Sequence, residues 1–126
     1  MKTKNLFLII STFIIPQIIL FISCKAFCAI EISSIEELQK IGFDPAYPNN
    51  ESYELTQDID ASDTVNWNNG AGFNPIYLTG NFDGKGHKIY NLFINRPDSY
   101  YVALFARSGT TTEVRNLGLE NVWIRG

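Results

Sequence analysis

The sequence predicts an all-β protein, folded as a right-handed parallel β-helix of few turns with a short capping helix at its N-terminal end. One observation is a pattern of aliphatic, any, Asn, aliphatic, any and aliphatic residues, which occupies Ile89–Ile94. The pattern returns at Val114–Leu119 and begins a third time at Leu119–Ile124. The step from the first copy to the second lies in the twenties, which is typical of solenoids, in which each turn buries its apolar edge against the next. The second observation is the Asn inside each copy, because Asn tolerates the left-handed backbone of a corner between strands.

The corner explains how one copy buries all its aliphatic residues. Simple alternation would place Ile89 and Asn91 on one face of a strand and Leu92 on the other. A corner at Asn91 reverses this phase, so that Ile89, Leu92 and Ile94 all point inward. Stacked turns are then expected to bring Asn91 and Asn116 into register, where side-chain amides can hydrogen-bond up the stack. The predicted structural Asn ladder consists of Asn91, Asn116 and Asn121.

A β-sandwich is the alternative architecture. In that fold the Asp83-Gly84 pair would close an antiparallel hairpin between residues 81–82 and residues 87–89, since Asp-Gly is a frequent hairpin turn.

Residues 1–28 are predicted to be a secretory signal peptide. Lys2 and Lys4 form a positive start, residues 6–22 are almost wholly apolar, and Ala26-Phe27-Cys28 fits the small-x-small cleavage rule. A signal anchor that stays in the membrane is a second interpretation, although Pro16-Gln17 interrupts the apolar run.

A third interpretation makes the leader a lipid attachment site. Phe21-Ile22-Ser23-Cys24 is similar to a bacterial lipobox with Phe in place of the usual Leu. Cys24 would then carry lipid and tether the protein, so that contact with a membrane would occur only through the leader or this lipid.

The mature module is predicted to span residues 29–126 and to form one domain. Both cysteines, Cys24 and Cys28, lie in the leader, so no disulfide would brace the module. Loss of the three leader lysines changes the formal charge from −3 to −6, because no acidic residue precedes Glu31. An acidic chain without a basic run argues against nucleic acid as a partner.

A short amphipathic helix is predicted at the start of the module. Ser34 and Glu37 have the spacing of a capping box, in which each side chain covers a free backbone amide. An apolar stripe and a helix stop follow at Ile35, Leu38, Ile41 and Gly42. Its apolar face would cover the first turn of the β-helix.

The remaining elements follow in order along the chain. We expect loops at 44–52, 61–74 and 96–100, strands at 53–56, 76–78 and 101–105, and turns at 83–86 and 108–112. The last repeat stops without a polar capping turn, so further repeats or a partner are expected at an open C-terminal edge.

Three blocks of the sequence together resemble a known family. Tyr53–Asp60, Phe82–Ile89 and Asn91–Ile94 are similar to the GLUG-motif repeats of large bacterial secreted and cell-surface proteins. The resemblance implies a β-helical, surface-exposed module and names no catalytic residues. The chain departs from the family at the motif itself, since Ala103-Leu104-Phe105-Ala106 stands where the family has Gly, Leu, any and Gly.

Catalytic and metal sites are weakly supported. His87 is the only histidine and has no evident partners for a Ser-His-Asp set. Asp58, Asp60 and Asp63 alternate as calcium ligands can, but the Gly and Glu that the twelve-residue calcium loop needs are missing. We therefore predict no catalytic residues, no metal and no cofactor.

The aromatic residues are the best candidates for ligand contact. Several of Tyr77, Phe82, Tyr90, Phe93 and Trp123 are expected to face outward, because they alternate with inward aliphatic residues. Exposed rings stack on sugars or anchor a protein partner, whereas the simpler interpretation is that they pack on neighbouring turns. The predicted ligand-binding residues are Trp67, Tyr77 and Trp123.

The sequence thus predicts a non-catalytic module, secreted or on the cell surface, that serves in adhesion, ligand binding or as a spacer. Its partner would be a glycan or a host or surface protein. The alternative function is a polysaccharide-degrading lyase or hydrolase on the same scaffold, since paired carboxylates on β-helices can cleave sugars.

Overall fold

The computed structural model describes residues 28–126, so the predicted signal peptide and Cys24 lie outside the described residues apart from Cys28. Short strands dominate and helix is scarce, as an all-β class requires. The first elements are β1 (Ile30–Ile32), α2 (Ile35–Lys40), β2 (Tyr53–Leu55), β3 (Ile59–Asp60) and the 3-10 helices η1 (Ser62–Asn66) and η2 (Asn68–Gly70). They are followed by β4 (Ile76–Leu78), β5 (Phe82–Asp83), β6 (Lys88–Tyr90), β7 (Phe93–Asn95), β8 (Phe105–Ser108), β9 (Val114–Arg115), β10 (Gly118–Glu120) and β11 (Trp123–Arg125). Within residues 28–126, no helix has the length and apolar character needed to cross a membrane.

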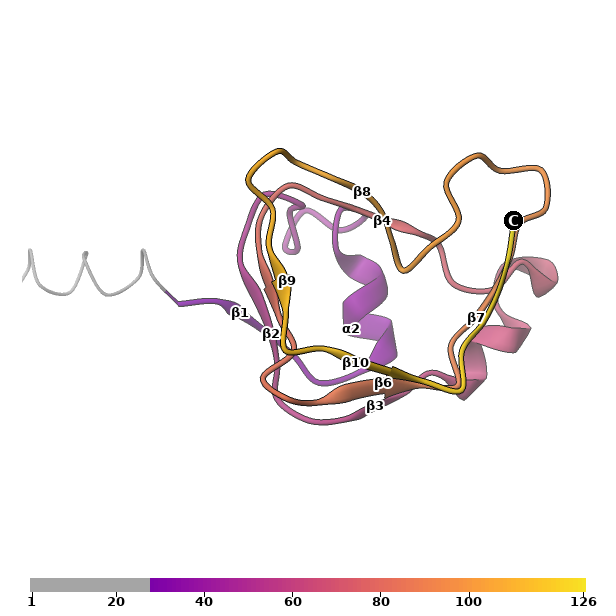
Figure 1. The fold of residues 1–126 in the computed structure, drawn as a ribbon, viewed down its shortest axis with the longest axis horizontal. Coiled ribbons are helices and arrows are strands. Elements are labelled where there is room, and N and C mark those ends of the chain that lie inside the picture. The colour runs from indigo at the N-terminus through magenta and orange to yellow at the C-terminus, as the bar shows by residue number, and fades with distance from the viewer. Residues whose placement is uncertain (1–27) are drawn as a thin grey trace, which may run out of the picture.

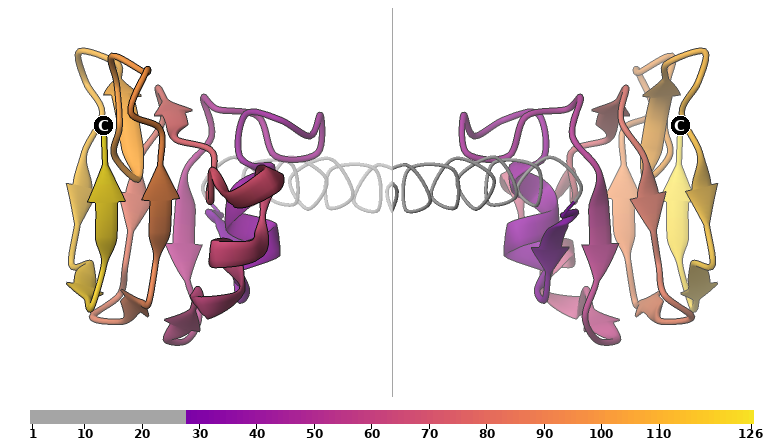
Figure 2. Two further views of the ribbon diagram at one scale, coloured as in Figure 1. Left: turned by 90° about the vertical axis from the view of Figure 1, so that its right-hand side faces the viewer. Right: turned by 90° about the vertical axis from the view of Figure 1, so that its left-hand side faces the viewer.

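The strands form four short parallel sheets, with the orders β1-β2-β5-β9, β3-β6-β10, β7-β11 and β4-β8. In Figure 1 these sheets lie around a common interior, with α2 seen in its middle. The side views in Figure 2 show the strands of each sheet side by side, with α2 at one end and the C-terminal strands at the other. We call β8–β11 the outer layer, because each of these strands is the last member of its sheet.

The antiparallel hairpin of the sandwich alternative does not form in the described residues. Phe82 of β5 pairs in parallel with Tyr53 and Val114, whereas Ile89 of β6 pairs in parallel with Ile59 and Leu119. The two segments that flank the Asp83-Gly84 turn therefore belong to different sheets.

From β2 onward, the step between paired strands is longer than the recurrence of the sequence pattern, so the prediction that Asn91 and Asn116 lie in register is wrong. Asn91 lies at the corner between β6 and β7, and its counterpart in the outer layer is Asn121, between β10 and β11 and 30 residues further along. Asp83 of β5 and its partner Arg115 of β9 are 32 residues apart. Asn116 lies at a different corner, between β9 and β10. The pattern recurs at a shorter step because corners on different sides of the molecule need the same local conformation.

The predicted reversal of phase at Asn91 is confirmed. Asn91, Asn116 and Asn121 have φ angles of 60°, 53° and 49°, all in the left-handed region that Asn tolerates. Ile89 and Ile94, which flank the first corner, are fully buried.

The predicted N-terminal helix is also confirmed, and it covers one end of the sheets. The Ser34 hydroxyl accepts a hydrogen bond from Glu37 N at 3.2 Å, as an N-cap does. The Glu37 carboxylate accepts from the backbone N and the hydroxyl of Ser33, which lowers the pKa of Glu37. Leu38 and Ile41 are fully buried in the core that the helix shares with the strands.

Two local predictions need correction. The strand expected at 101–105 begins at Phe105 instead, where the ring packs 5.1 Å from that of Phe82, while Tyr100 and Tyr101 are exposed. The expected loop 61–74 contains η1 and η2. Neither Ala103 nor Ala106 has a positive φ, so alanine is compatible with the backbone at the divergent motif.

Candidate functional site

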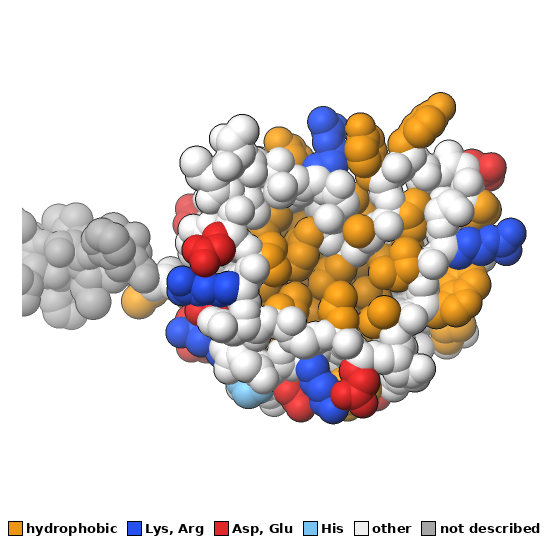
Figure 3. Space-filling model, viewed as in Figure 1, with side chains coloured by type: hydrophobic (Ala, Val, Ile, Leu, Met, Phe, Trp, Pro, Cys, Tyr) orange, Lys and Arg blue, Asp and Glu red, His pale blue; other side chains and the backbone are white. Residues whose placement is uncertain are grey.

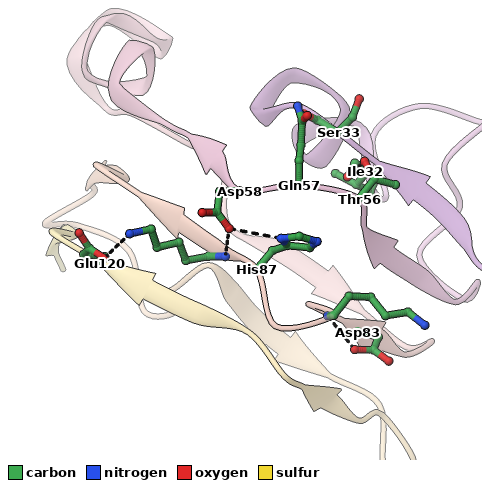
Figure 4. Close-up of polar contacts among 10 residues, drawn as sticks. Ile32, Ser33, Thr56, Gln57, Asp58, Asp83, His87 and Glu120 are labelled. Carbon is green, nitrogen blue, oxygen red and sulfur yellow. Dashed lines mark hydrogen bonds and ion pairs between the residues drawn. The ribbon is translucent and has the colours of Figure 1, made fainter.

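A chain of charged groups lies along the outside of the β3-β6-β10 sheet (Figure 4). Asp58 Oδ1 accepts from Lys88 N at 3.0 Å and lies 3.3 Å from His87 Nδ1. The Lys88 ammonium donates to Glu120 at 2.7 Å, and this hydrogen bond raises the pKa of Lys88. These side chains are substantially exposed, so each pair contributes little to stability. Within residues 28–126, the side-chain partner of His87 is the Asp58 carboxylate.

The acidic residues at the turns serve the backbone. Asp60 accepts from Ser62 N and from the Asn91 amide, and Asp83 accepts from Lys85 N and from the Asn116 amide. In both residues the hydrogen bond from the turn backbone is the main cause of a lowered pKa. Within the part of the chain that the structure describes, no three His, Cys, Asp or Glu side chains gather as a metal site would require.

A shallow hollow of about 300 Å³ lies over the β2-β5-β9 side of the molecule. Its charged side chains are mostly engaged with one another: Lys85 lies 3.2 Å from Glu54, and Arg115 lies 3.0 Å from Asp83 and 3.9 Å from Glu113. These ion pairs partly neutralise the hollow, whose lining carries the carboxylates of Glu54, Asp83 and Glu113 and the cations of Lys85 and Arg115.

The three aromatic residues predicted to bind ligand lie on different elements. Trp67 is half-buried between η1 and η2 and stacks on Phe73, with ring centroids 6.4 Å apart. Tyr77 on β4 is 46% exposed, and Trp123 on β11 is also 46% exposed. Of the other rings expected to face outward, Phe82 is fully buried and belongs to the core.

Both exposed rings are held by a neighbouring strand. The Arg107 guanidinium of β8 lies 5.4 Å from the centroid of Tyr77 and 5.4 Å from that of Tyr101. Trp123 stacks on Phe93 with centroids 4.6 Å apart and planes inclined by 7°. Tyr77 and Trp123 each remain partly exposed beside this contact, and an exposed ring can stack on a sugar or an apolar partner, although the two rings do not form one cluster. Sequence reasoning missed Arg107, since only the β4-β8 pairing brings it to Tyr77.

The outer layer carries an exposed apolar surface. Its inward residues Val114, Leu119 and Ile124 are 43%, 47% and 40% exposed. Their partners in the preceding layer, Phe82, Ile89 and Ile94, are each 0% exposed. Figure 3 looks onto this end, where hydrophobic side chains fill the centre and polar and charged groups surround them.

At the corners of this layer, the side-chain amides of Asn116 and Asn121 hydrogen-bond to side chains of the preceding layer. Asn121 Nδ2 donates to Asn91 Oδ1 at 2.6 Å, and Asn91 Nδ2 donates to Asp60 Oδ1 at 3.3 Å. At the other corner, Asn116 Nδ2 donates to Asp83 Oδ1 at 3.1 Å. The residues predicted to form one ladder therefore take part in two, each of which begins at an aspartate.

Comparisons with known proteins found two relatives of interest. Over 106 residues, the chain is 42% identical to Halomucin of Haloquadratum walsbyi, a match that covers 76% of this chain and 1% of that protein. Over 77 residues it is 36% identical to a protein of Evansella cellulosilytica named "Putative Gly-rich membrane protein", covering 57% of this chain and 9% of that one. The chain thus spans only a small part of the length of the curated relatives it matches. No protein-family model and no solved structure matches the chain.

Proposed function

We propose that the chain is an exported, non-catalytic repeat module of a bacterial surface or secreted protein, built as a few turns of a right-handed parallel β-helix. The observation that carries this proposal is the registered parallel pairing of four sheets, joined at corners where Asn adopts positive φ. Such pairing is how solenoid repeats bury their apolar edges. The blocks that resemble GLUG-motif repeats supply β2, β3, β5, β6 and β7.

The relatives support a location outside the cytoplasm. One is named Halomucin and the other is named as a membrane protein, and the chain matches a small part of each. Together with the signal-peptide pattern of residues 1–28, these names favour a module that is secreted or held at the cell surface. Cleavage after Cys28 would release the module, whereas lipid on Cys24 would tether it to a membrane.

We favour a role in binding or spacing over catalysis, because the acidic side chains and the histidine already have partners within the chain. Asp60 and Asp83 are occupied by turn amides and by the Asn ladders, and His87 faces Asp58. No described feature specifically favours the lyase or hydrolase alternative. We propose instead that Tyr77 and Trp123 offer ring faces to a glycan or a surface protein.

Location is tested by fractionation of cells that express the epitope-tagged chain, followed by intact mass measurement of each fraction. We expect the protein in the medium or at the cell surface, with a mass that begins at residue 29 or at a lipidated Cys24. Recovery of the uncleaved chain from the cytoplasm would contradict export.

Binding is tested on a glycan panel with the variants Tyr77→Ala and Trp123→Ala and the matched control Phe43→Ala, since Phe43 is also exposed but lies next to α2. Loss of a stacking ring should weaken glycan binding about tenfold, and the control should leave it unchanged. If neither a glycan nor a surface protein binds the parent chain, the spacer role is the part of the proposal that survives. Release of reducing or unsaturated sugar from the panel would replace the proposal by the enzymatic alternative.

A further inference from the structure

We infer that the outward face of the β4-β8 sheet is a subsite for an acidic sugar. The Arg107 guanidinium would bind the carboxylate of a uronic acid, and the exposed tyrosine rings beside it would contact the sugar ring. The inference rests on the proposed glycan-binding role of Tyr77 and adds the chemical class of the ligand.

An irregularity in the pairing of the two strands turns Arg107 to this face. The register of the β4-β8 pair shifts just before Tyr77, so that Tyr77 is paired with Arg107 and Ala106 is an extra residue without a partner. Without this shift, Ala106 would lie beside Tyr77 and Arg107 beside Leu78, which is fully buried. Bulges of this kind are frequent next to functional sites, where they redirect a side chain. This one places a cation beside an exposed ring.

The rings hold the guanidinium but leave its N–H donors without a partner within residues 28–126. Arg107 Cζ lies 5.4 Å from the ring centroids of both Tyr77 and Tyr101, and a side chain held in this way loses less entropy when it binds a ligand. By comparison, Arg115 is paired with Asp83. The ion pairs of the described residues all involve cations other than Arg107. The guanidinium is therefore positioned and uncompensated.

The accessibility of this face holds whether or not further strands follow β8. Along β4, Ile76 and Leu78 point inward and are 0% exposed, whereas Tyr77 between them is 46% exposed. Tyr77 keeps this exposure although β8 is paired beside it. Pairing covers the edge of a strand and not its outward side chains, so a strand paired beyond β8 would likewise leave Arg107 on the outside.

The chemistry of the face favours an acidic glycan. A planar guanidinium binds a carboxylate through two parallel hydrogen bonds, and an exposed ring stacks on the flat C–H face of a sugar. An acidic peptide would supply the carboxylate without that C–H face. The β4-β8 sheet lies across the molecule from the β3-β6-β10 sheet, which carries Asp58 and Glu120 (Figure 1). Because residues 29–126 have a formal charge of −6, we expect no indiscriminate adsorption of polyanions to the rest of the surface.

The test measures binding of the full chain to a polygalacturonate oligosaccharide by isothermal titration calorimetry, with its methyl-esterified form as the neutral counterpart. We expect the acid form to bind at least about tenfold more tightly than the ester, with a preference that shrinks as salt rises. Arg107→Gln should abolish the preference. Arg107→Lys should keep part of it, because an ammonium retains the charge but not the planar fork.

The matched control is Arg125→Gln, which removes the same charge from an exposed residue of β11, in a different sheet. This variant should keep the preference of the parent chain. Tyr101→Ala should weaken binding of the acid form, since it releases one side of the guanidinium. Thermal melting of each variant by circular dichroism establishes that it is folded.

Four results would overturn the inference. If the parent chain and Arg107→Gln bind the acid and ester forms equally, the acidic subsite is excluded while the proposed glycan binding stands. If neither form binds, the subsite is also excluded, and the wider glycan panel decides the proposed function separately. Polyglutamate that binds as tightly as the oligosaccharide and depends on Arg107 would assign the face to an acidic protein segment. Binding of dextran sulfate in place of polygalacturonate would assign it to a sulfated glycan.

Discussion

Replacing Thr64 by valine tests how the 3-10 segment η1 is joined to the sheets. Thr64 is fully buried, its hydroxyl donates to Ala61 O at 2.6 Å, and it accepts from Phe93 N at 3.0 Å. In Thr64→Val, Ala61 O keeps its bond from the backbone N of residue 64 at 3.0 Å, so only the Phe93 amide loses its partner. An unsatisfied donor in a buried site costs about 1–3 kcal/mol.

The matched control is Thr64→Ser, which keeps both hydrogen bonds and removes one methyl group, at a cost of about 0.8 kcal/mol for the lost burial. We expect the free energy of unfolding, measured in urea by tryptophan fluorescence, to fall further in the valine variant than in the serine variant. Hydrogen exchange should show faster exchange of the Phe93 amide in Thr64→Val alone. A valine variant as stable as the serine variant would refute the reasoning, because the hydroxyl would then contribute no more than the methyl.

Three other perturbations test the turns. Because the pKa values of Asp60 and Asp83 are lowered, the two carboxylates stabilise the fold above about pH 4, the ordinary carboxyl range, and this stabilisation is lost as the pH falls through their folded pKa values. The free energy of unfolding in urea should therefore be lower at pH 3 than at pH 7. The difference between the two pH values should be smaller in Asp83→Asn. Gly84→Ala would place a Cβ 2.4 Å from a backbone oxygen of the next layer, and we expect a loss of about 1–3 kcal/mol. Gly118→Ala should cost less in the same assay, because the nearest atom to its Cβ would be a side-chain carbon of Lys88 at 3.1 Å. Asn91→Asp should lower the melting temperature in low salt and recover part of it in high salt, since two carboxylates would face each other; a melting temperature that does not depend on salt would contradict the assigned ladder.

Much of the fold could be predicted because local chemistry decides it. The capping pattern at Ser34 and Glu37 specifies a helix start, and Asn91 specifies a corner at which the inward phase reverses. The step between layers could not be found in the same way, since it depends on which corner stacks on which. Segments of unequal length join the strands, with four residues between β5 and β6 but two between β9 and β10. This variation hides the layer step from a search for a fixed period.

The candidate site was harder to predict for a related reason. The exposure of a ring depends on the next layer: Phe82 was expected to be a candidate for the outside, but it lies beneath Val114 and against Phe105. Trp123 has no layer above it in the described residues and remains exposed. A single sequence shows that aromatic and aliphatic residues alternate, but only the stacking assigns each residue to the core or to the surface.

The positions of Asp60 and Asp83 indicate at which end each side-chain ladder begins, which the corner pattern alone does not show. A ladder of side-chain amides can begin at a residue that only accepts, and each later member must both donate and accept, which Asn does and Asp does not. Asp60 precedes Asn91 by 31 residues, Asn91 precedes Asn121 by 30, and Asp83 precedes Asn116 by 33. These separations lie close to the layer step, whereas the shorter step from Asn91 to Asn116 does not. An aspartate followed by asparagines at such separations therefore indicates both the step and the end at which the stack starts, and the same order predicts Asn, rather than Asp, at the corners of any layer that covers β10 and β11.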